Sequence, residues 1–485
     1  MKSVDTLPLE ESAIDRILYE LDAEVPFAAE WHSSTHTFFR FSAPTDETAP
    51  IDRLQTSQHE KIYWRDRNGT RESAGIGVTD SIMGESTDGT RTIMQAIQER
   101  TRNAPPNVRY YGGMRFRHDT TPDTYWSSFG GSRFILPFVE YVKEGGEYYC
   151  HCTLALPHGS SVEEARAALR QQLLAFKAAS QHAELQKTDK KIIDKAYSDE
   201  FSPSSQADKH TDTLRTDTPN KQGWKRSIEE AVREFNADRL EKVVLARRVT
   251  LDIAERPNAV ALLKERAAEA RRSTLFLFDF GNDAVFFGAT PEYLYRREGR
   301  TIATEAIAGT RKRGADEAED IALGNDLLFS DKERREHASV QRYVASGLDD
   351  LTESFDIGKV ELLKLSGLQH LYAPFTGRLR TDSDDAAIIE RLHPTPAVGG
   401  TPRREALEFL RREGFDRGWY AAPVGWVNAH AAEFVVALRS ALITDTLAHL
   451  FSGAGIVKGS ESDAEWNEIE MKIAPMLELF APQSA

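Results

Sequence analysis

Apolar and polar positions recur along the chain with two different periods. Residues 61–78, "KIYWRDRNGTRESAGIGV", and 109–117, "RYYGGMRFR", alternate aromatic and polar positions around Gly and Asn turns, which predicts antiparallel strands. Residues 161–180 and 331–351 have apolar residues at helical spacing, which predicts two long helices. Strands and helices are mixed without regular βαβ alternation. The pattern therefore predicts an α+β fold, in which large, mostly antiparallel β-sheets pack in layers with helices on the outside.

The second half of the chain contains a dense series of apolar stretches of strand length. In "EKVVLARRVTL", residues 241–251, a run of Val, Leu and Ala predicts a buried strand. The same pattern predicts strands joined by turns at residues 273–281, 284–297, 301–314, 422–443 and 447–457. A helix is predicted over residues 224–240, and a closing helix from about Asp463.

One long polar stretch interrupts this pattern. Residues 201–224, "FSPSSQADKHTDTLRTDTPNKQGW", are rich in Ser, Thr and Asp and lack apolar periodicity, which predicts an exposed connection. At 485 residues the chain also exceeds what one hydrophobic core usually serves. Two domains, or one large two-layer body, are therefore expected.

The charge balance disfavours two classes of partner. Acidic residues outnumber basic residues, 76 against 61, and the net charge of −15 would repel nucleic acid and anionic membranes. The chain shows no apolar run of bilayer length, no basic-then-apolar leader, and only two cysteines, Cys150 and Cys152. These features predict a cytoplasmic protein whose two thiols lie in the core. An anionic substrate would require a metal ion or local arginines in its pocket.

Two ionisable residues stand next to apolar runs that could change their chemistry. Lys242 begins the strand at 241–251, where it either extends outward on its long stem or points inward. Burial would favour the uncharged amine that a general base requires. Glu292 follows a "GATP" turn and is either solvated or held among aromatic walls, where it would stay protonated and act as an acid. Such a pair would support addition at one ring carbon with loss of a hydroxyl from another.

Two pairs of glutamates are each spaced three residues apart, which places each pair on one helix face. Glu333 and Glu336 form one pair in "KERREH", and Glu465 and Glu468 form the other in "AEWNEIEMK". Surface charge is the ordinary explanation, and Glu465 could instead complete a capping box with Ser462. If both pairs face inward, they would form a negative cluster that suits Mg²⁺.

Other residues could hold an anionic substrate through backbone N–H groups. Gly453 and Gly455 follow a predicted strand in "FSGAGIV", and Gly309, Thr310 and Arg311 lie in "AIAGTR". Glycine lets a ligand approach the backbone closely. Short Gly loops alone do not identify a ligand.

Four further side chains have both a functional and a structural explanation. Arg439 lies in the apolar "VVALRSALI", where it could grip a carboxylate or form a structural ion pair. His370 could donate to a substrate hydroxyl or a metal-bound group, or be a core histidine. Tyr420 could be pocket wall or core packing. Lys472 follows Glu468 by one helical turn and could attract an anion.

Assembled in order, these motifs resemble the chorismate-utilising enzymes, and specifically isochorismate synthases, from about residue 224 to 482. The motifs are "KVVLARR", "GATPE", "AIAGTRKRG", "REH", "LQHL", "HPTPAVGG", "RGWYAAPVGW", "VALRSAL", "SGAGIV" and "AEWNEIEMK". The segments "YWRDRNGTRESAGIG" and "RYYGGMRF" also resemble the N-terminal portion of these enzymes. The resemblance implies that residues 1–210 form an α/β portion completing the fold, and residues 220–485 the chorismate-binding catalytic portion.

The resemblance also implies an activity and a role for each candidate. The enzyme would be a Mg²⁺-dependent isomerase in which water attacks C2 of chorismate while the C4 hydroxyl leaves, giving isochorismate. The implied catalytic residues are the base Lys242, the acid Glu292, and His370 near the ring. The implied metal ligands are Glu336 and Glu468, with Glu333 and Glu465 acting largely through metal-bound water. The implied substrate contacts are Gly309, Thr310, Tyr420, Arg439, Gly453, Gly455 and Lys472. Mg²⁺ would first neutralise the glutamates, after which the cations could attract the dianion.

Two features distinguish this activity from its alternatives. Lys242 favours water as the nucleophile, because ammonia-using relatives typically lack this lysine, and "HPTPAVGGTP" at 393–402 resembles the loop of isochorismate formers. The nearest alternative is salicylate synthase, which goes on to eliminate pyruvate from isochorismate. A non-catalytic chorismate-binding protein is a third possibility, although it predicts a degraded charge set. We expect a monomer or homodimer whose product feeds menaquinone or siderophore biosynthesis.

Overall fold

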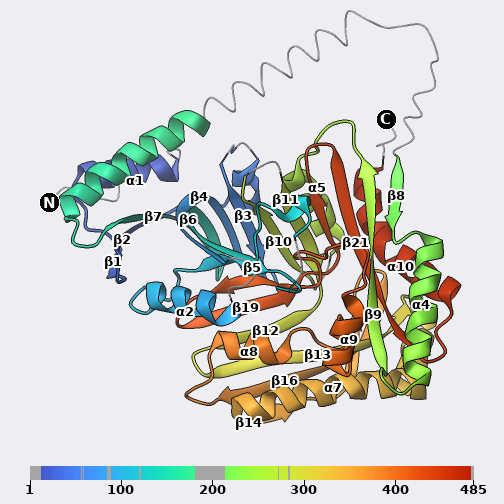
Figure 1. The fold of residues 1–485 in the computed structure, drawn as a ribbon. Coiled ribbons are helices and arrows are strands. Elements are labelled where there is room, and N and C mark those ends of the chain that lie inside the picture. The colour runs from blue at the N-terminus through green and yellow to red at the C-terminus, as the bar shows by residue number, and fades with distance from the viewer. Residues whose placement is uncertain are drawn as a thin grey trace, which may run out of the picture.

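The computed structural model describes residues 12–481, except residues 56, 58, 85–88, 120–121, 181–213, 271 and 282–283. All strand pairs in this part of the chain are antiparallel, and they join into one continuous, strongly curled sheet system. Helices cover its outer surfaces (Figure 1). The predicted α+β class with antiparallel sheets is therefore confirmed.

Strand β6 (Ser132–Glu144) is the branch point of the sheet system, because it pairs with β4, β5 and β7. On one side, β7 (Glu147–Pro157) pairs with β2 (His36–Pro44), which pairs with β1 (Ala29–His32). Cys150 and Cys152 are fully buried on β7 and are free thiols, as predicted.

A first arm of strands leads from β6 toward the C-terminal helix. Its strands, in spatial order, are β4 (Arg71–Gly84), β3 (Lys61–Arg65), β10 (Thr274–Asp279), β11 (Val285–Thr290), β20 (Ser440–Ile443), β21 (Leu447–Val457) and β9 (Lys242–Asp252). The outer edge of β9 pairs with two short strands, β8 (Arg215–Thr218) and β17 (Gly400–Thr401).

A second arm leads from β6 in another direction. Its strands are β5 (Tyr110–Met114), β18 (Pro423–Val427), β19 (Ala431–Val436), β12 (Tyr293–Glu298), β13 (Thr301–Lys312) and β16 (Leu368–Leu379), followed by β14 (Thr352–Ile357) and β15 (Glu361–Lys364). The two arms alternate along the sequence. Residues far apart in the chain are therefore brought to the same region.

The helices pack on the outside of these arms. They are α1 (Ala13–Asp22), residues 162–180, α2 (Thr90–Thr101), α4 (Lys221–Asn236), α5 (Ala259–Glu269), α6 (Glu317–Phe329), α7 (Asp331–Leu351), α8 (Asp385–Leu392), α9 (Arg403–Leu410) and α10 (Ser462–Leu477). In Figure 1, α7 runs along β13 and β16, while α4 and α10 lie beside β9 and β21. None of the helices in the described part combines the length and apolar character that a bilayer span requires.

Several predicted elements match the structure closely. Helix α7 has the predicted bounds 331–351, and β9 begins one residue after the predicted strand. The connection predicted at 201–224 was partly wrong. Residues 201–213 lie outside the described residues, but residues 215–218 form β8 and α4 begins at Lys221. An edge strand is open to solvent, so its sequence can be polar throughout and lack an apolar period.

The aromatic core reaches the second arm through Trp419, which is fully buried. Its indole ring contacts Phe129 and Phe278, with ring centroids 5.1 Å and 5.6 Å away. The preceding Gly418 has a positive φ of 54°, and a Cβ there would lie 2.0 Å from the Trp126 ring. Close packing of this kind leaves no room for an added methyl group.

We predict that Gly418→Ala lowers the free energy of unfolding by roughly 1–3 kcal/mol, because the new methyl group overlaps Trp126. Gly414→Ala is the control, since a Cβ at that position has no heavy atom within 4 Å. Urea unfolding followed by tryptophan fluorescence measures both. Equal stability of the two variants would contradict the packing described here.

Candidate active site

The two arms and two helices enclose a cavity of about 340 Å³. It lies between the strands β9 and β21 on one side and β13 and β16 on the other, with α7 and α10 supplying acidic side chains. All fourteen residues to which the resemblance gives a role line this cavity: Lys242, Glu292, Gly309, Thr310, Glu333, Glu336, His370, Tyr420, Arg439, Gly453, Gly455, Glu465, Glu468 and Lys472. The structure therefore brings the whole candidate set together.

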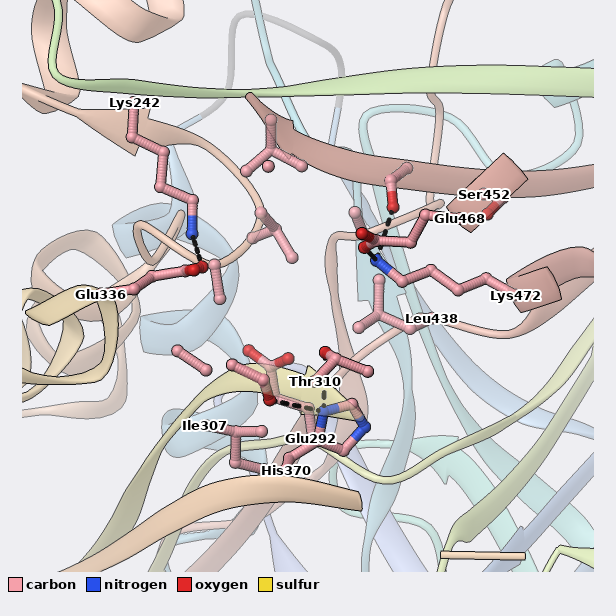
Figure 2. Close-up of a pocket in the computed structure, with 18 of the residues that line it drawn as sticks. Lys242, Glu292, Ile307, Thr310, Glu336, His370, Leu438, Ser452, Glu468 and Lys472 are labelled. Carbon is pink, nitrogen blue, oxygen red and sulfur yellow. Dashed lines mark hydrogen bonds and ion pairs between the residues drawn. The ribbon is translucent and has the colours of Figure 1, made fainter. Parts of the chain in front are cut away.

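Lys242 is the first residue of β9 and is only 9% exposed. The outward orientation considered for this residue is therefore wrong. Its Nζ donates a hydrogen bond to Glu336 Oε1 on α7, 2.7 Å away (Figure 2). In this arrangement Nζ is a hydrogen-bond donor, so a role as proton acceptor would require it to separate from Glu336.

The predicted loop at 393–402 holds the backbone around Lys242. Strand β17, within this loop, pairs with Lys242 and Val243, and the Val244 N–H donates to the Gly399 carbonyl at 2.9 Å. A Cβ at Gly400 would lie 2.3 Å from the Lys242 carbonyl oxygen. Glycine is thus required at position 400, where the two backbones approach closely.

Glu292 lies in the turn between β11 and β12 and is 9% exposed. Its pKa is raised to about 8, first by burial and second by the negative charge of Glu305. The cations Lys242, Arg67 and Arg439 oppose this shift without cancelling it. Glu292 is therefore protonated near neutral pH, as an acid catalyst requires. It enters the cavity from the side opposite Lys242 (Figure 2).

The four metal-ligand candidates face the cavity, but three of them are paired with cations. Glu336 pairs with Lys242, Glu468 pairs with Lys472 at 2.6 Å, and Glu333 pairs with Arg311 at 2.9 Å. The resemblance implied that Mg²⁺ would neutralise these glutamates first. Instead, basic residues of the chain itself already offset much of their charge.

Glu465 differs from the other three glutamates. The capping box considered for it is absent, because Glu461 occupies the N-cap of α10 and no side chain caps the helix. Burial raises the pKa of Glu465; a hydrogen bond with Ser460 lowers it, and nearby Glu468 raises it again. Glu465 thus lies in a place where an added positive charge would be favourable.

The donor chemistry of these glutamates fits a hard divalent cation such as Mg²⁺, which prefers carboxylate oxygens and water. Two carboxylates from each of two helices line one cavity, and burial, with a smaller contribution from nearby Glu468, raises the pKa of Glu465. Among the residues that the structure describes, no three acidic, histidine or cysteine side chains are gathered closely enough to hold a metal. Metal binding would therefore require the paired carboxylates to leave their lysines.

His370, on β16, is held in one orientation by β13. Its Nδ1 lies 3.2 Å from the Gly309 carbonyl oxygen and 3.1 Å from Thr310 Oγ1. Because a carbonyl oxygen only accepts, Nδ1 carries the proton and donates to Gly309. Burial, and then Arg439, lowers the pKa of His370 to about 3. The neutral ring in this tautomer has Nε2 as an acceptor, and the role of His370 as a donor to substrate stays a prediction.

Arg439 was predicted inside a strand, but it lies in the connection between β19 and β20. Its φ is +51°, a left-handed conformation that costs energy for a residue with a side chain. Burial is the main reason that the pKa of its guanidinium is lowered to about 10. The guanidinium is still charged at neutral pH, and it lines the cavity where an anion could bind.

The remaining substrate-contact candidates form one wall of the cavity. Tyr420 stacks on Phe451 with ring centroids 5.1 Å apart, so it is both packed and cavity-facing. Lys472 Nζ donates to the Gly453 carbonyl at 3.1 Å as well as to Glu468. A Cβ at Gly455 would lie 2.7 Å from Lys242 Cε. The absence of a side chain at Gly455 therefore makes room for Lys242.

Sequence reasoning missed two cations that also line the cavity, Arg417 and Lys332. Arg417 is buried, and its guanidinium binds Glu413 and the carbonyls of Val398 and Val244. Arg417 is a cation directly before the apolar run "GWYAAPVGW", just as Lys242 is a cation directly before the apolar residues of its strand. This pattern could have identified Arg417 as a candidate. Lys332 gave no such signal, because an exposed lysine at a helix start is ordinary.

Comparison with known proteins agrees with this geometry. Residues 27–481 match the family described as "Chorismate binding enzyme". The chain belongs to the chorismate-binding enzyme family. The family resemblance inferred from the motifs is therefore confirmed.

Several relatives carry a more specific name. A chloroplastic isochorismate synthase of Catharanthus roseus is 33% identical over 383 residues, covering 77% of this chain but only 62% of that protein. The salicylate biosynthesis isochorismate synthase of Pseudomonas aeruginosa is 34% identical over 382 residues, covering 78% of this chain and 75% of that protein. The solved structure of MenF, the menaquinone-specific isochorismate synthase from Escherichia coli, aligns with a TM-score of 0.78 at 27% identity, over 97% of this chain and all of that one.

We predict that Gly455→Ala lowers chorismate turnover on the order of ten- to a hundredfold, because the new methyl group displaces the end of Lys242. The atoms nearest to the new methyl group belong to the end of a lysine side chain, which can shift, so the melting temperature should stay close to that of the wild type. Gly367→Ala is the control, since a Cβ there has no heavy atom within 4 Å. Unchanged turnover in Gly455→Ala would argue against the position assigned to Lys242.

Proposed function

We propose that this chain is an isochorismate synthase, an isomerase that converts chorismate to isochorismate. The observation that carries the proposal is the placement of Lys242 and Glu292 on opposite sides of one cavity (Figure 2). A base and a protonated acid facing each other across a ring are what an addition coupled to loss of a hydroxyl requires. The names of the relatives from Catharanthus, Pseudomonas and Escherichia support the same activity.

The proposed reaction balances in atoms and protons. Water attacks C2 while the uncharged amine of Lys242 takes its proton, the ring double bonds shift, and the C4 hydroxyl leaves as water with the proton of Glu292. One water enters and one leaves, so the net reaction is an isomerisation. Lys242 ends as an ammonium and Glu292 as a carboxylate, and proton exchange with solvent restores both.

We propose Mg²⁺ as the cofactor, held by Glu336 and Glu468 directly and by Glu333 and Glu465 largely through water. The ion would supply positive charge for a substrate carboxylate. Release of Glu336 from Lys242 is part of this proposal, because the same carboxylate serves both cations. The site's own cations, including Arg439 and Lys472, would hold the dianionic substrate, together with the backbone at Gly309, Thr310, Gly453 and Gly455.

The other expectations from the sequence stay predictions. A cytoplasmic location and a monomeric or homodimeric state belong to this group, as do a product feeding menaquinone or siderophore synthesis and the division into portions 1–210 and 220–485. The MenF name and the Pseudomonas name point to different product fates in those relatives.

Product analysis tests the proposed function. Purified protein with chorismate and Mg²⁺ should accumulate isochorismate, identified by chromatography and mass spectrometry. Salicylate with an equal amount of pyruvate would instead identify a salicylate synthase. Chorismate that binds and stays unconverted would identify a non-catalytic binding protein.

Lys242→Ala should lower turnover by roughly 10²–10⁴-fold, as expected for loss of a general base. Chorismate binding in the presence of Mg²⁺, measured by calorimetry, should persist, because the fold does not depend on this amine. Lys264→Ala removes an exposed lysine that pairs with Asp52 and serves as the control. Wild-type turnover in Lys242→Ala would remove this residue from the mechanism.

Glu468→Gln should weaken Mg²⁺ binding by tenfold or more, since a carboxylate ligand becomes a neutral amide. Glu470→Gln is a matched control on the same helix, because Glu470 pairs with Arg215 and Arg247. Calorimetric titration with Mg²⁺ compares the two variants. Equal affinities would place the metal site elsewhere.

A further inference from the structure

Arg67 lies far from the catalytic motifs in sequence, in the turn between β3 and β4. Its guanidinium nevertheless reaches the second arm, where Nη1 donates to Glu305 Oε2 on β13 at 2.8 Å and Nη2 donates to Glu305 Oε1. Both side chains are almost fully buried, 8% and 3% exposed. A buried, two-point pair of this kind is strongly oriented, because each charge depends on the other for its neutralisation.

The same pair is bonded to the backbone on both sides of Glu292. Arg67 Nη2 also donates to the Pro291 carbonyl, and the Tyr293 N–H donates to Glu305 Oε1 at 2.7 Å. The Arg67 guanidinium additionally lies 4.0 Å from the centre of the Tyr293 ring. Pro291 and Tyr293, the residues before and after Glu292, are thus both hydrogen-bonded to the same ion pair. The Glu292 side chain itself faces the cavity.

The charges around Glu292 come from several elements. Burial is the largest cause that favours the protonated acid, and Glu305 on β13 is the second. Lys242 on β9, Arg67 from the β3–β4 turn and Arg439 between β19 and β20 act in favour of the carboxylate. Burial is the main reason that the pKa of Tyr420 is raised, and the charge of Glu292 also contributes to this rise. Glu305 is therefore the charged residue that offsets three nearby cations.

We propose that Arg67 and Glu305 form a positioning pair for the acid Glu292, fixing its backbone and keeping a negative charge beside it. This inference rests on the proposed function, because it assigns Glu292 the role of proton donor. It also assigns a task to the N-terminal part of the chain, which supplies Arg67. Neither residue needs to touch substrate.

The two parts of this role can be separated by substitution. Glu305→Gln removes the negative charge, so the pKa of Glu292 falls and the protonated acid is lost at lower pH. The alkaline limb of the kcat/KM profile should therefore move downward by roughly one pH unit. Glu305→Asp keeps the charge but shortens the reach, so kcat should fall on the order of tenfold while the limb stays in place. Arg67→Lys keeps a positive charge but loses the fork, and should also lower kcat without a downward shift.

A second buried pair provides matched controls. Arg40 and Glu140 are each 2% exposed, with the nitrogen and oxygen 3.1 Å apart, and neither lines the cavity. Glu140→Gln and Arg40→Lys should cost stability, measured as melting temperature, without moving the alkaline limb. A limb that moves equally in Glu140→Gln and Glu305→Gln would overturn the inference, as would a folded Glu305→Gln whose limb does not move.

A measurement on substrate-free protein separates this inference from the proposed function. Infrared difference spectra between wild type and Glu292→Gln isolate the carboxylic acid band of Glu292, which can be followed with pH. The band should disappear at lower pH in Glu305→Gln than in Glu305→Asp. If wild type leaves chorismate unconverted, the proposed function fails, and this infrared titration still decides whether Glu305 controls Glu292. Identical titration midpoints of the Glu292 band in Glu305→Gln and Glu305→Asp would show that the charge of Glu305 does not set the pKa of Glu292.

Discussion

Charge balance inside a confined cavity is the constraint on which the site depends. Five glutamates and several cations line one space of about 340 Å³, where unpaired charges are costly. The chain meets this constraint by pairing Glu336 with Lys242, Glu468 with Lys472 and Glu333 with Arg311. In the proposed reaction two of these pairs must open, so cofactor binding and release of the base are one event. The pairs also make the cavity less negative than its five glutamates alone would make it.

The sheet architecture makes this arrangement possible. The first arm supplies Lys242 and the second supplies His370, while α7 and α10 supply four of the five glutamates. Antiparallel pairing in one continuous system fixes the register between these segments, so side chains separated by hundreds of residues keep their relative positions. The N-terminal part of the chain also contributes, because Arg67 in the β3–β4 turn binds Glu305, which in turn binds the backbone next to Glu292.

Sequence reasoning identified the residue types that burial makes unusual. Lys242 in an apolar strand and the glutamate pairs at helical spacing carried their own signal, and helix 331–351 followed from its period. The partner of each residue was not predictable, because spacing within a segment says nothing about which distant segment lies opposite. For the same reason the sequence did not identify Arg67, whose partner Glu305 lies on a distant strand. The strand β8 was predicted as a loop, because its pairing with β9 leaves no apolar pattern in its own sequence. The positive φ of Arg439 depends on the junction of β19 and β20, which no local pattern encodes.

In the proposed reaction, solvent water deprotonated at Lys242 becomes the new hydroxyl of the product. Turnover of chorismate in ¹⁸O-labelled water with Mg²⁺, followed by mass spectrometry of the product, tests this step. We expect one solvent oxygen in isochorismate, located at C2, and loss of the original C4 oxygen to the medium. Isochorismate that retains the original hydroxyl oxygen and contains no label would exclude attack by water, because the hydroxyl would then have migrated within the substrate.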